Sequence, residues 1–162
     1  MAKIQLDSLD RAILTHLVED GRKSFAEISA DLNVSAGTIR NRLTRLEESG
    51  TVRIIGFVDM AQVGMHAYAT IHLRISPATM IPDVVDALSQ FPEVSFLASV
   101  SGDYDLHVDV QCLDNEHLVT LLQKRIQTLA GVVDTKTTMM LKVHKYGQSD
   151  LEILRLLAEE EE

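Results

Sequence analysis

The chain has 162 residues, of which 46% are hydrophobic and 24% charged, a composition that indicates a globular protein of one domain or two small ones. No apolar run approaches the roughly 18 residues of a membrane-spanning helix, and the first ten residues lack the apolar core of a signal peptide. The single cysteine, Cys112, excludes an internal disulfide framework and falls in an apolar strand pattern, where we expect a buried, unreactive thiol. We therefore predict a cytoplasmic protein without a membrane partner.

The formal net charge is −9, which taken alone argues against a nucleic-acid partner. The charge is unevenly distributed, because residues 1–58 contain eight basic and eight acidic residues and the remainder carries the whole excess of acid. Within the neutral part, the stretch from Ser35 to Leu46 contains three arginines and no acid. A local basic helix of this kind is a candidate phosphate-binding surface on an acidic protein.

Two short helices are predicted first. LDRAILTHLVEDG (9–21) repeats its apolar residues at helical spacing after Asp7, a residue type that caps helices. SFAEISADLNV (24–34) follows, and its Ser24 and Glu27 have the spacing of a capping box. Both segments therefore begin with a helix-start signal and have one side suited to burial.

A third helix is predicted from SAGTIRNRLTRLEESG (35–50), in which Ile39, Leu43 and Leu46 form the apolar stripe. TVRIIGFV (51–58) then reads as a β-branched strand. Three helices and a trailing strand describe a winged helix-turn-helix, whose third helix would lie in the major groove of DNA, although a small helical bundle with a solvated arginine face has the same pattern. The candidate DNA contacts are Ser35, Ala36, Gly37, Thr38, Arg40, Asn41, Arg42, Thr44, Arg45 and Arg53.

The second half of the chain has a different order of elements. Strand patterns at 67–75, 93–100, 104–112 and 132–143 are interrupted by helical patterns at 80–91 and 115–129. The order β-α-β-β-α-β predicts a ferredoxin-like antiparallel sheet with both helices on one face, so the fold class is α+β. We place the winged helix-turn-helix domain at 1–56, a linker at 57–66, the ferredoxin-like domain at 67–145 and a helical tail at 146–162.

The loop SGDYD, residues 101–105, places two aspartates around a tyrosine directly after Gly102. Two acids could form a catalytic dyad or a metal site, but the chain supplies no recognisable nucleophile and base, and its histidines are scattered. We therefore predict no enzymatic activity, no metal and no cofactor. Two interpretations stay open: an ordinary hairpin turn, or a clamp in which backbone amides bind a carboxylate and an aspartate accepts from an ammonium group.

Taken together, the segments LDSLDRAIL, EDGRKSFAEISADLNVS, TIRNRLTRLEESG and SGDYD resemble, in their order and spacing, the Lrp/AsnC (leucine-responsive, feast/famine) family of prokaryotic transcription regulators. The resemblance implies a sequence-specific DNA-binding regulator that is modulated by a small amino-acid effector. It also implies that SGDYD contributes to the effector pocket. The effector-binding residues carried over on this basis are Val100, Gly102, Asp103, Tyr104, Asp105 and, on the last strand, Thr137 or Thr138.

The same resemblance implies the partners. They are double-stranded DNA, a small amino acid and a second copy of the chain, in a dimer whose sheets pack face to face and which associates further, up to octamers. A prokaryotic regulator of this kind would be associated with the nucleoid. Two other functions remain compatible with the residues: an amino-acid-sensing subunit of a metabolic enzyme, and a chromatin-like architectural protein that binds DNA with little sequence preference.

Overall fold

A computed structural model describes residues 5–145 and divides the chain into two compact units, with the boundary between Phe57 and Val58. The predicted linker, 57–66, starts one residue before this boundary and contains a short 3₁₀ helix, η1, Met60–Val63. The predicted helical tail, 146–162, lies outside the described residues. None of the described helices is both long and apolar enough to cross a lipid bilayer.

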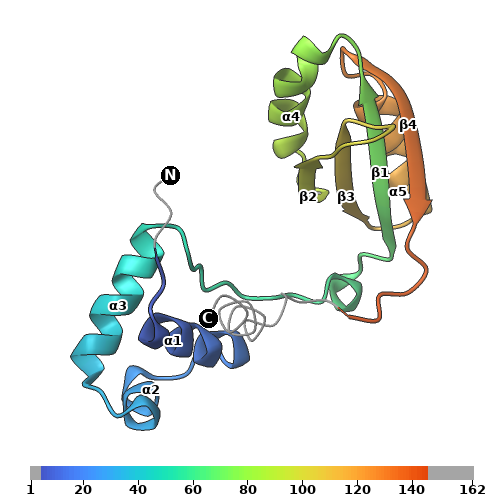
Figure 1. The fold of residues 1–162 in the computed structure, drawn as a ribbon. Coiled ribbons are helices and arrows are strands. Elements are labelled where there is room, and N and C mark those ends of the chain that lie inside the picture. Colours follow the sequence, from blue (N-terminus) through green and yellow to red (C-terminus); the bar gives the residue numbers. More distant parts are fainter. Residues whose placement is uncertain (1–4, 146–162) are drawn as a thin grey trace. The chain divides into compact units, whose positions relative to one another are not determined.

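The N-terminal unit contains the three predicted helices (Figure 1), which are α1 Ser8–Glu19, α2 Phe25–Leu32 and α3 Ala36–Glu48. Each begins where a side chain caps its first turn: the side chains of Asp7, Ser24 and Ser35 accept hydrogen bonds from backbone amides three residues further on. The predicted capping box of α2 is present, and α1 has a second one. Local capping chemistry therefore sets where all three helices start.

The core of the N-terminal unit is one apolar cluster to which every helix contributes. It consists of Ile13, Leu17, Ile28, Ile39 and Leu43. The last two belong to the predicted stripe of α3, so α3 packs against α1 and α2 with this side. The opposite side of α3 is left on the surface, as a recognition helix requires.

The predicted strand after α3 is not formed. Residues 52–59 have no regular secondary structure, and Ile55 and Phe57 in this segment are 73% and 67% exposed. A strand needs a neighbour for its backbone amides and carbonyls, and the described part of the N-terminal unit contains no other strand. The prediction of a strand at 51–58 is therefore wrong for the described residues, where this unit offers the segment no strand to pair with.

The C-terminal unit has the predicted β-α-β-β-α-β order. Its strands are β1 Ala67–Ile75, β2 Val94–Ser99, β3 Leu106–Cys112 and β4 Val132–Met139. Its helices are η2 Ala78–Met80, α4 Ile81–Ser89, α5 Asn115–Leu121 and the π-helical turn η3 Leu122–Ile126. The strands form one antiparallel sheet in the order β2-β3-β1-β4, which confirms the ferredoxin-like fold and the α+β class.

The two faces of this sheet differ in character. Ile71 of β1 and Val108 of β3 face each other across the ladder, are fully buried, and share one core cluster with Leu88 of α4 and Leu118 of α5. Both helices therefore cover the same face (Figure 1). The alternate residues point to the other face, where His72 of β1 lies opposite His107 of β3.

Candidate nucleic-acid interface and effector loop

The outer side of α3 displays small and polar side chains. Arg40, Asn41 and Thr44 are exposed, and no hydrogen bond joins their side chains to another described residue. The Arg40 guanidinium lies 5.9 Å from the centre of the Phe25 ring on α2, a cation–π contact that does not neutralise its charge. At the start of the helix, Gly37 is also exposed. This side can approach a nucleic acid closely and offers both charge and hydrogen-bonding groups.

Ser35 and Thr38, also predicted as DNA contacts, are engaged within the helix start. The Ser35 Oγ accepts from the Thr38 amide at 3.0 Å and lies 2.9 Å from the Thr38 hydroxyl. Ala36 is exposed beside them, and Arg53 is exposed in the segment after α3. The structure thus brings most of the predicted contacts to one helix, with Arg53 beyond its end.

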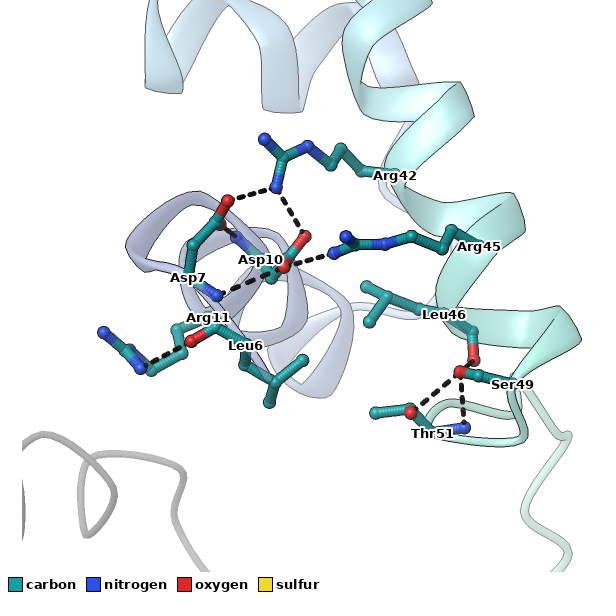
Figure 2. A network of polar contacts seen from close by, with 9 residues as sticks. All are labelled: Leu6, Asp7, Asp10, Arg11, Arg42, Arg45, Leu46, Ser49 and Thr51. Atoms are coloured by element: carbon teal, nitrogen blue, oxygen red, sulfur yellow. Dashed lines mark hydrogen bonds and ion pairs between the residues drawn. The ribbon is translucent and has the colours of Figure 1, made fainter. Parts of the chain in front are cut away.

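Arg42 and Arg45 point to α1 (Figure 2). Arg42 Nη1 donates to Asp10 Oδ1 at 3.1 Å and makes a second ion pair with Asp7, while Arg45 Nη2 pairs with Asp10 Oδ2. Asp10 is completely buried. The pattern of arginines in the sequence could not distinguish these two from Arg40, because their partners lie more than 30 residues earlier in the chain.

The Arg42 guanidinium lowers the pKa of Asp7 from its ordinary value of 3.8 to about 2, chiefly through their hydrogen bond and further through the Asp10 amide. The same bond to Asp7 raises the pKa of Arg42. The Asp7 carboxylate is therefore charged throughout the physiological range, and it serves at once as helix cap and as ion-pair partner.

Asp7→Asn should lower the melting temperature at neutral pH by an amount that disappears in acid. Because the pKa of Asp7 is depressed in the folded state, its contribution is fully present above about pH 4 and is lost as pH falls through about 2. Asparagine retains the capping function, so the comparison isolates the ion pair. Thermal unfolding of both proteins between these pH values measures the difference, and a difference independent of pH would contradict the assignment.

In the C-terminal unit, SGDYD connects β2 to β3 as predicted for a hairpin. Gly102 has φ +121°, a conformation that other residues rarely adopt. Asp105 closes the turn: its amide donates to Leu73 O and its carbonyl accepts from Val100 N, both at 2.9 Å. Its carboxylate accepts from the amide of Ile75 at 2.6 Å. Asp105 therefore joins the loop to the end of β1.

Asp103 differs from Asp105. Its carbonyl accepts from Arg74 Nε at 3.1 Å, but no hydrogen bond or ion pair of its carboxylate is found within residues 5–145. Asp103 is exposed on the surface, whereas Asp105 is partly buried. Of the two loop aspartates, only Asp103 has a carboxylate that is both exposed and without a partner within residues 5–145, as a ligand-binding carboxylate would be.

Tyr104 lies over two residues of β1. The Arg74 guanidinium is 5.4 Å from the centre of the Tyr104 ring, and the His72 ring is 5.8 Å from it. The Tyr104 hydroxyl donates to Asp134 Oδ2 of β4 at 3.4 Å, and Arg74 lies 4.0 Å from the same oxygen. Arg74 and Asp134 were not predicted as site residues, because only the pairing of β4 with β1 brings them to the loop.

The two threonines predicted on β4 lie on opposite faces. Thr137 pairs with Ile71, whose side chain enters the core, whereas Thr138 pairs with Thr70 on the face that also carries His72. Near the start of β4, an open depression is lined by Gln127, Val132, Val133, Asp134 and Thr135. It shares Asp134 with the Tyr104 contact, so the loop and the depression adjoin.

No group of three potential metal ligands occurs among the residues that the structure describes. Cys112 is buried, as predicted, and burial raises the pKa of its thiol to about 11, which keeps it protonated and unreactive.

Both units of the chain match models of known protein families. The AsnC-type helix-turn-helix domain matches residues 6–47, and the Lrp/AsnC ligand binding domain matches residues 66–150. An uncharacterized HTH-type transcriptional regulator of Pyrococcus horikoshii is 35% identical over 90% of this chain and 92% of its own. The HTH-type transcriptional regulator Ptr1 of Methanocaldococcus jannaschii is 34% identical over 88% of this chain and 96% of its own.

Two solved structures have the same fold. The structure of AsnC from E. coli superimposes with a TM-score of 0.84 at 25% identity, covering 91% of this chain and 99% of that one. A transcriptional regulator of Neisseria meningitidis, solved in complex with L-Met, superimposes with a TM-score of 0.82 at 25% identity, covering 90% and 96%.

Proposed function

This chain belongs to the Lrp/AsnC family of HTH-type transcriptional regulators, and from that premise we propose that it binds specific DNA sequences through α3 and responds to an amino acid bound at the SGDYD loop. The observation that carries the DNA-binding part is the exposed side of α3, where the side chains of Arg40, Asn41 and Thr44 have no hydrogen-bond or ion-pair partner among the described residues. Arginine and asparagine read base edges or bind phosphates, and a threonine hydroxyl can do either.

Sequence selection tests this part directly. Duplexes recovered by the protein from a random library should share a nearly palindromic motif, and the protein should bind the recovered duplex far more tightly than a scrambled one at fixed salt. Equal affinity for the two duplexes, with a steep salt dependence, would instead support a low-specificity architectural protein. The helix-turn-helix match over residues 6–47 speaks against the third possibility, a sensing subunit of an enzyme.

The effector part rests on the exposed groups around SGDYD. An α-amino acid carries an ammonium and a carboxylate group, and the loop offers the Asp103 carboxylate for the first. Backbone amides beside Gly102 can bind the carboxylate of the amino acid. The space there is open, because no other atom lies within 4 Å of the position that a β-carbon would occupy on Gly102. The L-Met complex of the Neisseria regulator shows that a protein of this fold binds an amino acid. We propose an amino acid as effector here, with no other cofactor and no enzymatic step.

A second copy of the chain is the partner that we propose for the outer sheet face. Thr70 donates to Asp109 at 2.6 Å and His107 contacts it at 2.9 Å, so these three polar side chains of the face are satisfied internally. Phe96 packs edge-on against His107 and remains 53% exposed. A face with satisfied polar groups and exposed aromatic surface is suited to packing against a copy of itself. DNA binding would place this assembly in the cytoplasm, at the nucleoid.

Light scattering should therefore show a dimer or a larger assembly at micromolar concentration, and Phe96→Asp should shift the population towards monomer because it introduces a charge into the contact. Val133→Asp is the matched control, since Val133 is equally exposed, at 57%, on the edge strand β4. A wild-type protein that remains monomeric would contradict the packing of sheet against sheet.

A further inference from the structure

We propose that Asp10 is a positioning residue for DNA binding: its buried carboxylate holds Arg42 and Arg45 against α1 and thereby sets the orientation in which α3 presents Arg40 and Asn41. This inference rests on the proposed function, because it divides the arginines of one helix between two tasks. Arg40 contacts the DNA, and Arg42 and Arg45 orient the helix that carries Arg40.

The geometry at Asp10 ties α1 to α3 at a single carboxylate (Figure 2). Its Oδ1 accepts from Arg42 Nη1 at 3.1 Å, and its Oδ2 accepts from Arg45 Nη2 and from the Asp7 amide, the latter at 3.2 Å. The Asp10 side chain is only 1% exposed. A buried carboxylate is costly unless it is paired and hydrogen-bonded, so departure of either arginine is opposed.

The position of these arginines on α3 explains why they can act on its orientation. Arg42 and Arg45 are three residues apart, beside the buried Leu46, whereas Asn41 and Thr44 are three apart on the exposed side. Apolar packing is non-directional and tolerates small rotations of a helix about its axis. Charge-assisted hydrogen bonds to one fixed carboxylate do not, because they constrain both distance and angle.

The charges around the three arginines of α3 also separate Arg40 from Arg42 and Arg45. Two arginines face two carboxylates in the network, since Arg42 also pairs with Asp7, so the cluster is neutral as a whole. Arg40 has no carboxylate partner among the described residues, and its guanidinium makes a cation–π contact with the Phe25 ring. Release of counterions from DNA follows the cations that neutralise phosphates, and of these three arginines only Arg40 is available for it.

The salt dependence of DNA binding by the full chain separates the two tasks. The probe is the duplex that the wild-type protein recovers from a random library, and the variants are Arg40→Gln, Arg45→Gln and Asp10→Asn. In the proposed dimer, Arg40→Gln removes one phosphate contact from each of two copies, so it should make the slope of log affinity against log salt shallower by about 1.8, or about 0.9 for each contact. Arg45→Gln and Asp10→Asn should each lower the affinity several-fold at every salt concentration and leave the slope unchanged.

Two comparisons complete the design. Lys124→Gln removes an exposed positive charge from the C-terminal unit and should alter neither affinity nor slope. The double variant Asp10→Asn/Arg45→Gln should lose no more affinity than the more affected single variant, because both substitutions break one interaction. A purely structural role would lower the melting temperature without changing DNA affinity well below it.

A shallower slope in Arg45→Gln would overturn the inference, since Arg45 would then contact a phosphate itself. Unchanged affinity in Arg45→Gln would overturn it as well. If Asp10→Asn does not fold, Arg45→Gln decides alone, because that side chain is 46% exposed and its loss leaves the core intact. Failure of the wild-type protein to bind any duplex would refute the proposed function instead, so the two failures are distinguishable.

Discussion

Replacing Arg40 and Asn41 together by alanine should weaken binding to the selected duplex at least about 25-fold, because each side chain is expected to lose a contact to a base or phosphate. Both residues are exposed on the side of α3 opposite the core, so the substitution should leave the melting temperature nearly unchanged. Fluorescence anisotropy at one fixed salt concentration measures the affinity, and thermal unfolding in the same buffer checks the fold.

The matched control for this double variant is Gln123→Ala/Lys124→Ala, which removes an exposed amide and an exposed cation from the C-terminal unit. It should bind the duplex like the wild type. If the Arg40/Asn41 variant also binds like the wild type, α3 is not the recognition helix.

Asp103→Ala should affect effector binding and Asp105→Ala should affect stability, although the two residues lie in one five-residue loop. Asp103→Ala should abolish stabilisation by the effector and leave the unliganded protein as stable as the wild type, because its carboxylate has no partner within residues 5–145. Asp105→Ala should destabilise the unliganded protein by about 1–3 kcal/mol, because it leaves the amide of Ile75 without its acceptor.

The measurement is a thermal-shift screen of the twenty amino acids against the wild type, repeated on both variants with the amino acid that raises the melting temperature. Gly102→Val provides a further check, since a β-branched residue at φ +121° distorts the loop backbone and should also abolish the response. Undiminished stabilisation in both Asp103→Ala and Gly102→Val would show that SGDYD is only a turn.

The fold was predictable because its signals are local. Alternation in AYATIHLRI and helical spacing around Val84 and Leu88 are properties of neighbouring residues, and the structure confirms both. The capping residues Asp7, Ser24 and Ser35 act on amides three positions away, so helix starts could also be predicted. The prediction of a strand at 51–58 was wrong because the propensity of a segment is local, whereas a strand also requires a neighbouring strand.

The sites were only partly predictable, because the division of labour among like residues depends on distant contacts. Arg42 and Arg45 differ from Arg40 through Asp10, on another helix. Asp105 differs from Asp103 through the amide of Ile75, thirty residues earlier. In each case, residue type and local spacing point to a segment, and tertiary contacts decide which of its side chains keeps no partner among the described residues.

The central claim is that DNA binding and amino-acid binding are coupled in one molecule. The most direct test measures the affinity of the wild-type protein for its selected duplex with and without the amino acid that stabilises it. We predict a change of roughly 5- to 150-fold, and an equal change in the affinity for the amino acid when DNA is present, since coupling between two sites is reciprocal. An identical DNA affinity at saturating amino acid would contradict the account.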